Sequence, residues 1–175
     1  MILESVTVST FRSSTAKPLL RCSFASECFK ERFIYLRLMA VLTLLLSGRA
    51  MTLAFLGRVG GGQVGDPPEA WLMPLLGDAV IGVTALLALF LILRGRGLWA
   101  WLLILTWNAL AIWDALSAFI ISVTNPWPEF FMLQLFGPSM FFVASLLHLV
   151  IIVMALRPEV MAHFGVSQTR LNGAI

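Results

Sequence analysis

The sequence predicts an all-α integral membrane protein built as an up-down four-helix bundle. Hydrophobic residues make up 59% of the 175 residues and charged residues only 12%, whereas a soluble domain of this size needs far more charge to cover its surface. Four apolar runs are each long enough to cross about 30 Å of hydrocarbon at roughly 1.5 Å per residue. The spans are expected at 34–57, 71–93, 98–123 and 130–156. Together they make residues 33–157 one membrane domain.

Residues 1–32 precede the first predicted span and contain no apolar run of helix length. Two interpretations of them stay open: a disordered cytoplasmic extension, or translation that begins upstream of the true start. The first span also has an alternative, because its run 38–46 and the following Ser47-Gly48-Arg49-Ala50 resemble a signal peptide cleaved after Ala50. A membrane span is preferred, since apolar residues resume at once at 51–56.

The predicted connections between the spans are short and rich in helix-breaking residues. They contain a triple glycine with a double proline, an Arg-Gly-Arg-Gly turn and a Pro-Trp-Pro sequence, at 58–70, 94–97 and 124–129. Short connections make consecutive helices antiparallel neighbours, which predicts the up-down order. The triple glycine is not a phosphate-binding loop, because no strand precedes it and no Lys-Ser/Thr pair follows. The tryptophans are assigned to the interfacial belt of the membrane and to lipid-facing positions rather than to a cofactor site, with Trp71 as an interfacial anchor.

Basic residues gather in alternate connections. They lie before the first span, between the second and third spans, and after the fourth, where residues 158–175 form a tail. The other two connections hold Arg58 together with the acids Asp66, Glu69 and Glu129. By the positive-inside rule both termini are cytoplasmic, and the chain is a multi-pass protein of the cell inner (plasma) membrane. The basic excess is therefore a topology signal, and no basic patch interleaved with aromatic residues indicates nucleic-acid binding.

No cofactor and no metal site are predicted. Cys22 and Cys28 lie in the amino-terminal segment, on the reducing side of the membrane by this topology, where a structural disulfide is not expected. The Cys-x-x-Cys pairs of thiol oxidoreductases are missing from the sequence. Haem ligation by His148 would need a second intramembrane histidine, and His163 lies beyond the last span.

Polar side chains inside the spans form the candidate site: Arg49, Asp78, Asn108, Asp114, Gln134 and His148. An ionisable side chain in hydrocarbon is costly and therefore suggests function. Counted from the outer ends of the spans, Arg49 lies roughly 12 Å deep, Asp78 roughly 10 Å and Asp114 roughly 13 Å. These three residues define a charged layer in the outer half of the bilayer, in which Arg49 is predicted to pair with one or both carboxylates. Gly137-Pro138 falls at the same depth, where the proline should kink the fourth span.

A second polar group lies below the charged layer. On the fourth span the 4-3-4-3 spacing places one stripe of residues on a single face: Gln134, Pro138, Phe141, Ser145 and His148. Asn108 of the third span is within reach of His148 by the same depth count. The usual role of such a stripe is to join packed membrane helices by hydrogen bonds between their polar side chains. A proton relay from His148 to the charged layer is the alternative.

The pattern Pro-Pro-Glu-Ala-Trp, followed by Gly77-Asp78-Ala79-Val80-Ile81-Gly82, Trp107-Asn108 and Trp113-Asp114, resembles small four-span bacterial inner-membrane proteins of unassigned function. The resemblance covers roughly residues 39–160 and implies a fold without a reaction. The chain is also similar to the four-span sterol isomerase and sigma-2-receptor-like group, which has a double proline and a tryptophan before an intramembrane acid. It departs from that group at Arg49 in the first span.

Two functions follow as expectations. The first is a non-enzymatic accessory, binding or transport module with a buried Arg/Asp/Asp cluster. The alternative is an intramembrane enzyme that acts on a lipid or quinone-like substrate, with Asp78 or Asp114 as its acid/base. A general acid/base needs a pocket and a partly unpaired carboxyl, whereas a structural cluster pairs every charge. The lipid bilayer is the expected partner, and a second copy of the chain or another membrane protein is left open as a further one.

Overall fold

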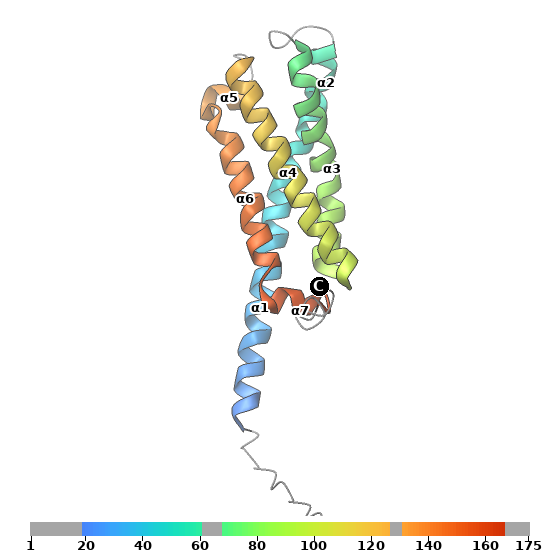
Figure 1. Cartoon of the computed structure of the whole chain (residues 1–175), viewed down its shortest axis with the longest axis vertical. Helices are drawn as coiled ribbons and strands as arrows, with labels where there is room; N and C mark the ends of the chain where they lie inside the picture. Colours follow the sequence, from blue (N-terminus) through green and yellow to red (C-terminus); the bar gives the residue numbers. More distant parts are fainter. Residues whose placement is uncertain (1–18, 61–67, 127–130, 167–175) are drawn as a thin grey trace, which may run out of the picture.

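A computed structural model describes residues 19–60, 68–126 and 131–166 of the chain. Every regular element in these ranges is helical, as predicted. Along the chain they are α1 (Leu19–Leu46), η1 (Ser47–Thr52), α2 (Leu53–Gly60), η2 (Pro68–Trp71), α3 (Leu72–Arg94), α4 (Leu98–Thr124), α5 (Phe131–Phe136), α6 (Ser139–Ala155) and α7 (Pro158–His163). Figure 1 shows α3, α4 and α6 running alongside the rod formed by α1, η1 and α2, with α7 across one end.

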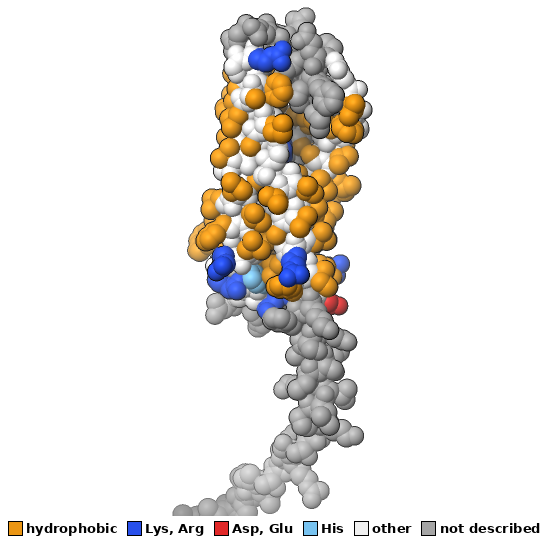
Figure 2. Space-filling view, turned by 180° about the vertical axis from the view of Figure 1, so that it is seen from behind, with side chains coloured by type: hydrophobic (Ala, Val, Ile, Leu, Met, Phe, Trp, Pro, Cys, Tyr) orange, Lys and Arg blue, Asp and Glu red, His pale blue; other side chains and the backbone are white. Residues whose placement is uncertain are grey.

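Among the described residues, three helical segments are long and apolar enough to cross a membrane: Glu31–Arg58, Glu69–Arg94 and Leu98–Thr124. Their outward faces carry large apolar side chains over the length of each helix. Figure 2 shows these side chains along the molecule, with Lys and Arg gathered mainly at the end that carries α7. This end is called the basic end below, and the opposite end, with α2 and η2, the distal end. An exposed apolar surface of this extent matches hydrocarbon rather than water.

The fourth predicted span, 130–156, is two helices rather than one. Helix α5 ends at Phe136, α6 begins at Ser139, and Gly137 between them has φ of +59°. This left-handed conformation favours glycine, and Pro138 has no N–H to continue the helical hydrogen bonds. The kink predicted at Gly137-Pro138 is therefore a complete break. It leaves α6 as an apolar helix of 17 residues.

The first predicted span, 34–57, is also interrupted. Between α1 and α2 the chain forms the 3₁₀-helix η1, whose tighter turn is unusual in the middle of a long helix. Helix α3 lies against it at Gly82. A Cβ atom at Gly82 would overlap the backbone nitrogen of Ala50 and lie 2.6 Å from the carbonyl carbon of Arg49. The backbones of η1 and α3 thus approach too closely for any side chain at position 82.

Both ends of the chain differ from the prediction. Helix α1 begins at Leu19, so residues 19–32 are helical rather than disordered; residues 1–18 lie outside the described part of the chain. The physical reason is that neither glycine nor proline follows Pro18 before Gly48. The predicted tail 158–175 begins with α7, which has Pro158 in its first turn, while residues 167–175 lie outside the described ranges.

In the described part of the chain, two apolar cores join the helices. The basic-end core includes large side chains with no exposed surface, among them Met39, Ile92, Ile104, Ile151 and Phe164. The smaller distal core consists of Trp71, Leu75, Ala118 and Phe141. On α3, α4 and α6 the predicted site residues Asp78, Asn108, Asp114 and His148 lie between residues of these two cores, whereas Gln134 lies on α5, outside this interval. The bundle therefore consists of apolar packing at both ends and a polar level between them.

Candidate functional site

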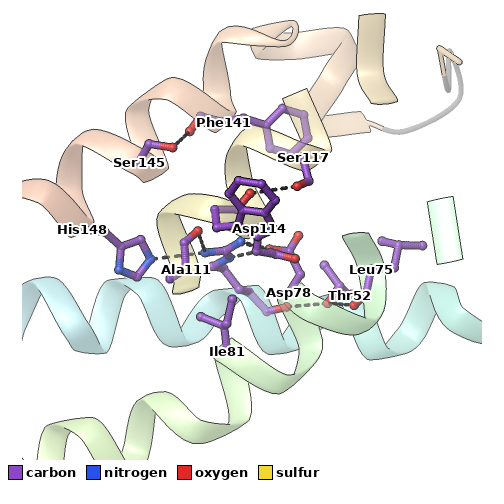
Figure 3. Close-up of polar contacts among 12 residues, drawn as sticks. Thr52, Leu75, Asp78, Ile81, Ala111, Asp114, Ser117, Phe141, Ser145 and His148 are labelled. Carbon is purple, nitrogen blue, oxygen red and sulfur yellow. Dashed lines mark hydrogen bonds and ion pairs between the residues drawn. The ribbon is translucent and has the colours of Figure 1, made fainter. Parts of the chain in front are cut away.

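Arg49 lies at the centre of the polar level. Its Nε donates to Asp78 Oδ1 at 2.5 Å, and its Nη2 donates to Asp114 Oδ2 at 2.6 Å. Asp78 Oδ1 also forms an ion pair with the same Nη2. The arginine side chain is only 12% exposed and each aspartate side chain 14%. Figure 3 shows the two acidic members of this cluster, Asp78 of α3 and Asp114 of α4, with the His148 ring of α6 to one side. The predicted pairing of Arg49 with the two carboxylates is present in the structure.

The remaining nitrogen of the guanidinium extends the cluster. Arg49 Nη1 lies 3.2 Å from His148 Nε2 and 3.5 Å from the carbonyl oxygen of Ala111. A guanidinium can only donate hydrogen bonds, so Nε2 is the acceptor and the ring proton is on Nδ1. His148 Nδ1 then donates to Asn108 Oδ1 at 2.9 Å, and Asn108 Nδ2 donates to the carbonyl oxygen of Ile104 at 2.8 Å.

The two polar groups of the prediction are thus one continuous polar network. We use this name for the charged layer together with its neutral extension, His148 and Asn108. Both neutral side chains are fully buried. Burial without a hydrogen-bond partner would be costly for either of them. Each neutral side chain therefore depends on its neighbour for a hydrogen-bond partner, and these hydrogen bonds hold the network in one arrangement.

A glycine makes room for the second carboxylate. A Cβ atom at Gly77 would overlap Asp114 Oδ1 and lie 2.8 Å from Asp114 Cγ. The Asp114 carboxylate therefore lies directly against the backbone of α3, next to Asp78. Thr52 secures the other side of the cluster, since its Oγ1 donates to the carbonyl oxygens of Arg49, at 2.7 Å, and Leu75, at 3.3 Å. These contacts fix η1 to α3 at the level of the charges.

Gln134 does not join the network. Its side chain is exposed on α5, while Phe141 and His148 are buried on α6. The predicted stripe assumed one continuous helix, and the break at Gly137-Pro138 destroys the spacing between positions 134 and 141. Within α6 the stripe persists, with Ser145 Oγ donating to the carbonyl oxygen of Phe141 at 2.9 Å.

Several tryptophans have inward roles that the sequence prediction missed. Trp71 and Trp101 are buried, and their indole nitrogens donate to the carbonyl oxygens of Asn125 and Ala155. Trp107 packs edge-on against the His148 ring, with 5.3 Å between the ring centroids, and donates to Thr84 Oγ1. The only available signal was the position of Trp107 directly before Asn108. A lipid-facing orientation was therefore wrong for these three, while their depth relative to the membrane interface stays a prediction.

The described residues include no group of three or more His, Cys, Asp or Glu side chains that could hold a metal ion. A pocket of about 570 Å³ lies along α3 towards the basic end, and Asp78 and Asp114 are not among its lining residues, which are Leu86, Leu89, Phe90, Leu93 and Arg94. This pocket is thus separate from the two carboxylates.

No protein-family model, no curated protein and no solved structure matches this chain. The resemblances noted from the sequence therefore stay expectations.

Proposed function

We propose that this chain is a multi-pass protein of the cell inner membrane, with four spans in an up-down bundle and both termini cytoplasmic. The three long apolar helices support the first three spans. Helix α6, with 17 residues, has a length of roughly 26 Å, which is near the thickness of the hydrocarbon. Arg94 ends α3, Arg96 follows it and Arg157 immediately precedes α7. The Gly97 N–H donates to the carbonyl oxygen of Phe164 and joins these segments at the basic end. These arginines support a cytoplasmic position for that end.

Cysteine labelling in intact cells tests this topology. Cys22 and Cys28 are first replaced by serine, and single cysteines are then introduced as Gln63→Cys, in the connection before α3, and Arg94→Cys, at the end of α3. A membrane-impermeant thiol reagent should modify position 63 and spare position 94, while both should react in opened membranes. Modification of position 94 in intact cells contradicts the proposed orientation.

We further propose that the protein acts as a non-enzymatic accessory or binding module organised by the polar network. The observation that carries this proposal is that Arg49 engages both carboxylates at once. An acid/base catalyst also needs a pocket that holds its substrate against the carboxyl, and the pocket along α3 is not lined by Asp78 or Asp114. The same geometry disfavours a proton relay, because His148 accepts from Arg49, donates to Asn108 and so leads only to the carbonyl oxygen of Ile104.

Comparison of lipid and quinone pools tests the non-enzymatic proposal against the enzyme alternative. Membranes containing the wild-type chain are compared with membranes containing Asp78→Asn or Asp114→Asn at matched protein levels. A non-enzymatic module leaves the pools unchanged in all of them. A lipid or quinone species that forms only with the wild-type chain would instead support an intramembrane enzyme.

A second copy of the chain or another membrane protein remains the expected partner of such a module. Cross-linking of the wild-type chain in its own membrane, followed by sizing, tests this expectation. An adduct at twice the mass of 19.3 kDa indicates a homodimer. A chain that stays monomeric at all cross-linker concentrations contradicts self-association.

A further inference from the structure

The side chains of the charged layer do not balance one another. Arg49 contributes one positive charge, and Asp78 and Asp114 contribute two negative charges when both are ionised. His148 adds no charge, because its Nε2 accepts from Arg49 and its Nδ1 donates to Asn108. A protonated His148 would direct a second N–H at Arg49 Nη1, so that two donors would face each other. One negative charge is thus left over.

No other described charge approaches the cluster to neutralise it. The titratable and polar groups that meet there are Arg49 from η1, Asp78 from α3 and His148 from α6. Helix α4 contributes Asp114 and the neutral Asn108. The electrostatic partners of Asp114 are Asp78 and Arg49, and that of His148 is Arg49. A charge that is buried among apolar helices without a counter-ion is costly. The folded cluster therefore requires one additional positive charge.

The geometry points to a proton as the occupant. Both carboxylates approach the same nitrogen, Arg49 Nη2, and are therefore close neighbours. The other oxygen of Asp114, Oδ1, lies against the backbone of Gly77, where even a Cβ atom would overlap it. This leaves no room there for a metal ion with its water shell. A proton needs no such space, because it is held within a carboxyl group.

We propose that the charged layer is a proton-binding site in which Asp78 and Asp114 together hold one proton beside Arg49. The inference rests on the proposed non-enzymatic function and specifies what the module binds. Uptake of the proton forms one carboxyl O–H bond, and no other bond is made or broken. Its release to water leaves two neighbouring carboxylates with one arginine, and the repulsion between them works against the contact of α3 with α4. The proton thus helps to close the bundle at this level.

Infrared difference spectra of the full chain in lipid nanodiscs test the proposal. At neutral pH the wild-type protein should show the carbonyl band of a protonated carboxyl. Either Asp78→Asn or Asp114→Asn should abolish this band, because the remaining carboxylate then balances Arg49 one to one. Arg49→Gln removes the cation that pairs with both carboxylates, so two protons are needed and the band should roughly double. If Arg49→Gln fails to fold, the two asparagine variants still decide the question.

Three results would overturn the inference. The first is a wild-type spectrum without the band at neutral pH. The second is a band that persists in both asparagine variants. The third is stabilisation of the wild-type protein by sodium or potassium over choline at equal ionic strength, with no carboxyl band, since a metal cation would then occupy the site. A change in the lipid or quinone pools would contradict the non-enzymatic function and leave the band unaffected, so the two failures are distinguishable.

Discussion

The polar network and the basic-end core hold the helices together by different physical means. In the core, Met39, Ile104 and Ile151 are completely buried and stabilise the bundle by packing. In the network, one guanidinium joins Asp78, Asp114 and His148 from three other helices. Loss of a core side chain leaves a cavity whose cost follows its volume. Loss of a charged side chain leaves its partners buried without compensation, so the cost depends on what remains.

The two regions also differ in how closely the helices approach. At the network, Gly77 and Gly82 leave no room for a Cβ atom, and Ala111 and Ala115 of α4 are completely buried. At the basic end, bulky side chains fill the space between the helices instead. Short contacts between polar atoms need backbones that lie close together. The polar network is therefore expected to be sensitive to added volume, and the core to lost volume.

The largest effect is expected for Arg49→Ala, which removes the single cation of the network. At neutral pH we expect a loss of about 3–5 kcal/mol in the free energy of unfolding, because two carboxyls are left without their partner. The triple variant Arg49→Ala, Asp78→Asn, Asp114→Asn should be more stable than the single one, since it deletes the charges together. Denaturant titration in mixed micelles measures both. A triple variant that is less stable than Arg49→Ala would show that the two carboxylates stabilise the protein even without Arg49, and so would contradict the expectation that the three charges act together.

The next effect concerns the basic-end core. Phe164, just after α7, has no exposed surface. Phe164→Ala should lower the free energy of unfolding by roughly 3 kcal/mol, at the lower end of the range for buried aromatic residues. Phe90→Ala is the matched control, because Phe90 on α3 is 59% exposed. The same titration measures both variants, and equal losses would show that Phe164 does not fasten α7 to the bundle.

The sequence was sufficient to predict the helical fold and the meeting of Arg49, Asp78 and Asp114, because depth along a helix follows from simple counting. The direction in which a side chain points around the helix axis does not follow from counting residues along the span. The inward positions of Trp71, Trp101 and Trp107 were missed for this reason, since an aromatic residue fits equally well in a lipid belt or a core.

The local breaks were missed for another reason. The 3₁₀ geometry of η1 depends on its contact with α3 at Gly82, and a single span cannot reveal a contact with another. The break after α5 was expected only as a kink, because the left-handed conformation of Gly137 is not visible in its neighbours. The docking of α7 was missed because a six-residue helix is too short to have a clear apolar period.

A smaller effect is expected at the contact between η1 and α3. Gly82→Ala places a methyl group where the Ala50 backbone already lies, and overpacking of this kind costs about 1–3 kcal/mol. Gly57→Ala is the control, because a Cβ atom there has nothing within 4 Å. The control should be neutral or slightly stabilising, as alanine favours a helix over glycine. Equal stability of the two variants would mean that η1 can move away from α3 without lowering the free energy of unfolding.

The smallest effect is a pH dependence at the basic end. The pKa of His163 is lowered from its ordinary value of 6.5 by burial first, and then by the positive charges of Arg96 and Arg32, while a backbone contact with Ile92 acts in the opposite direction. Its ring nitrogen Nε2 lies 2.5 Å from Arg96 Nη1. A neutral histidine can accept a hydrogen bond from arginine there, whereas a protonated one cannot.

The sign of the effect follows from the lowered pKa. As the pH falls through the ordinary range of histidine, the unfolded chain takes up a proton at His163 before the folded chain does. The stability contributed by this contact is present above that range and is lost as the pH falls towards the lowered pKa. Unfolding titrations at pH 8 and pH 5 should therefore show a smaller loss of stability on acidification for His163→Gln than for the wild-type protein. His148 is unchanged in both proteins, so its contribution cancels in the comparison. An identical pH dependence of the two would show that protonation of His163 does not affect the stability of the folded protein in this pH range, and that its contact with Arg96 is not pH-sensitive there.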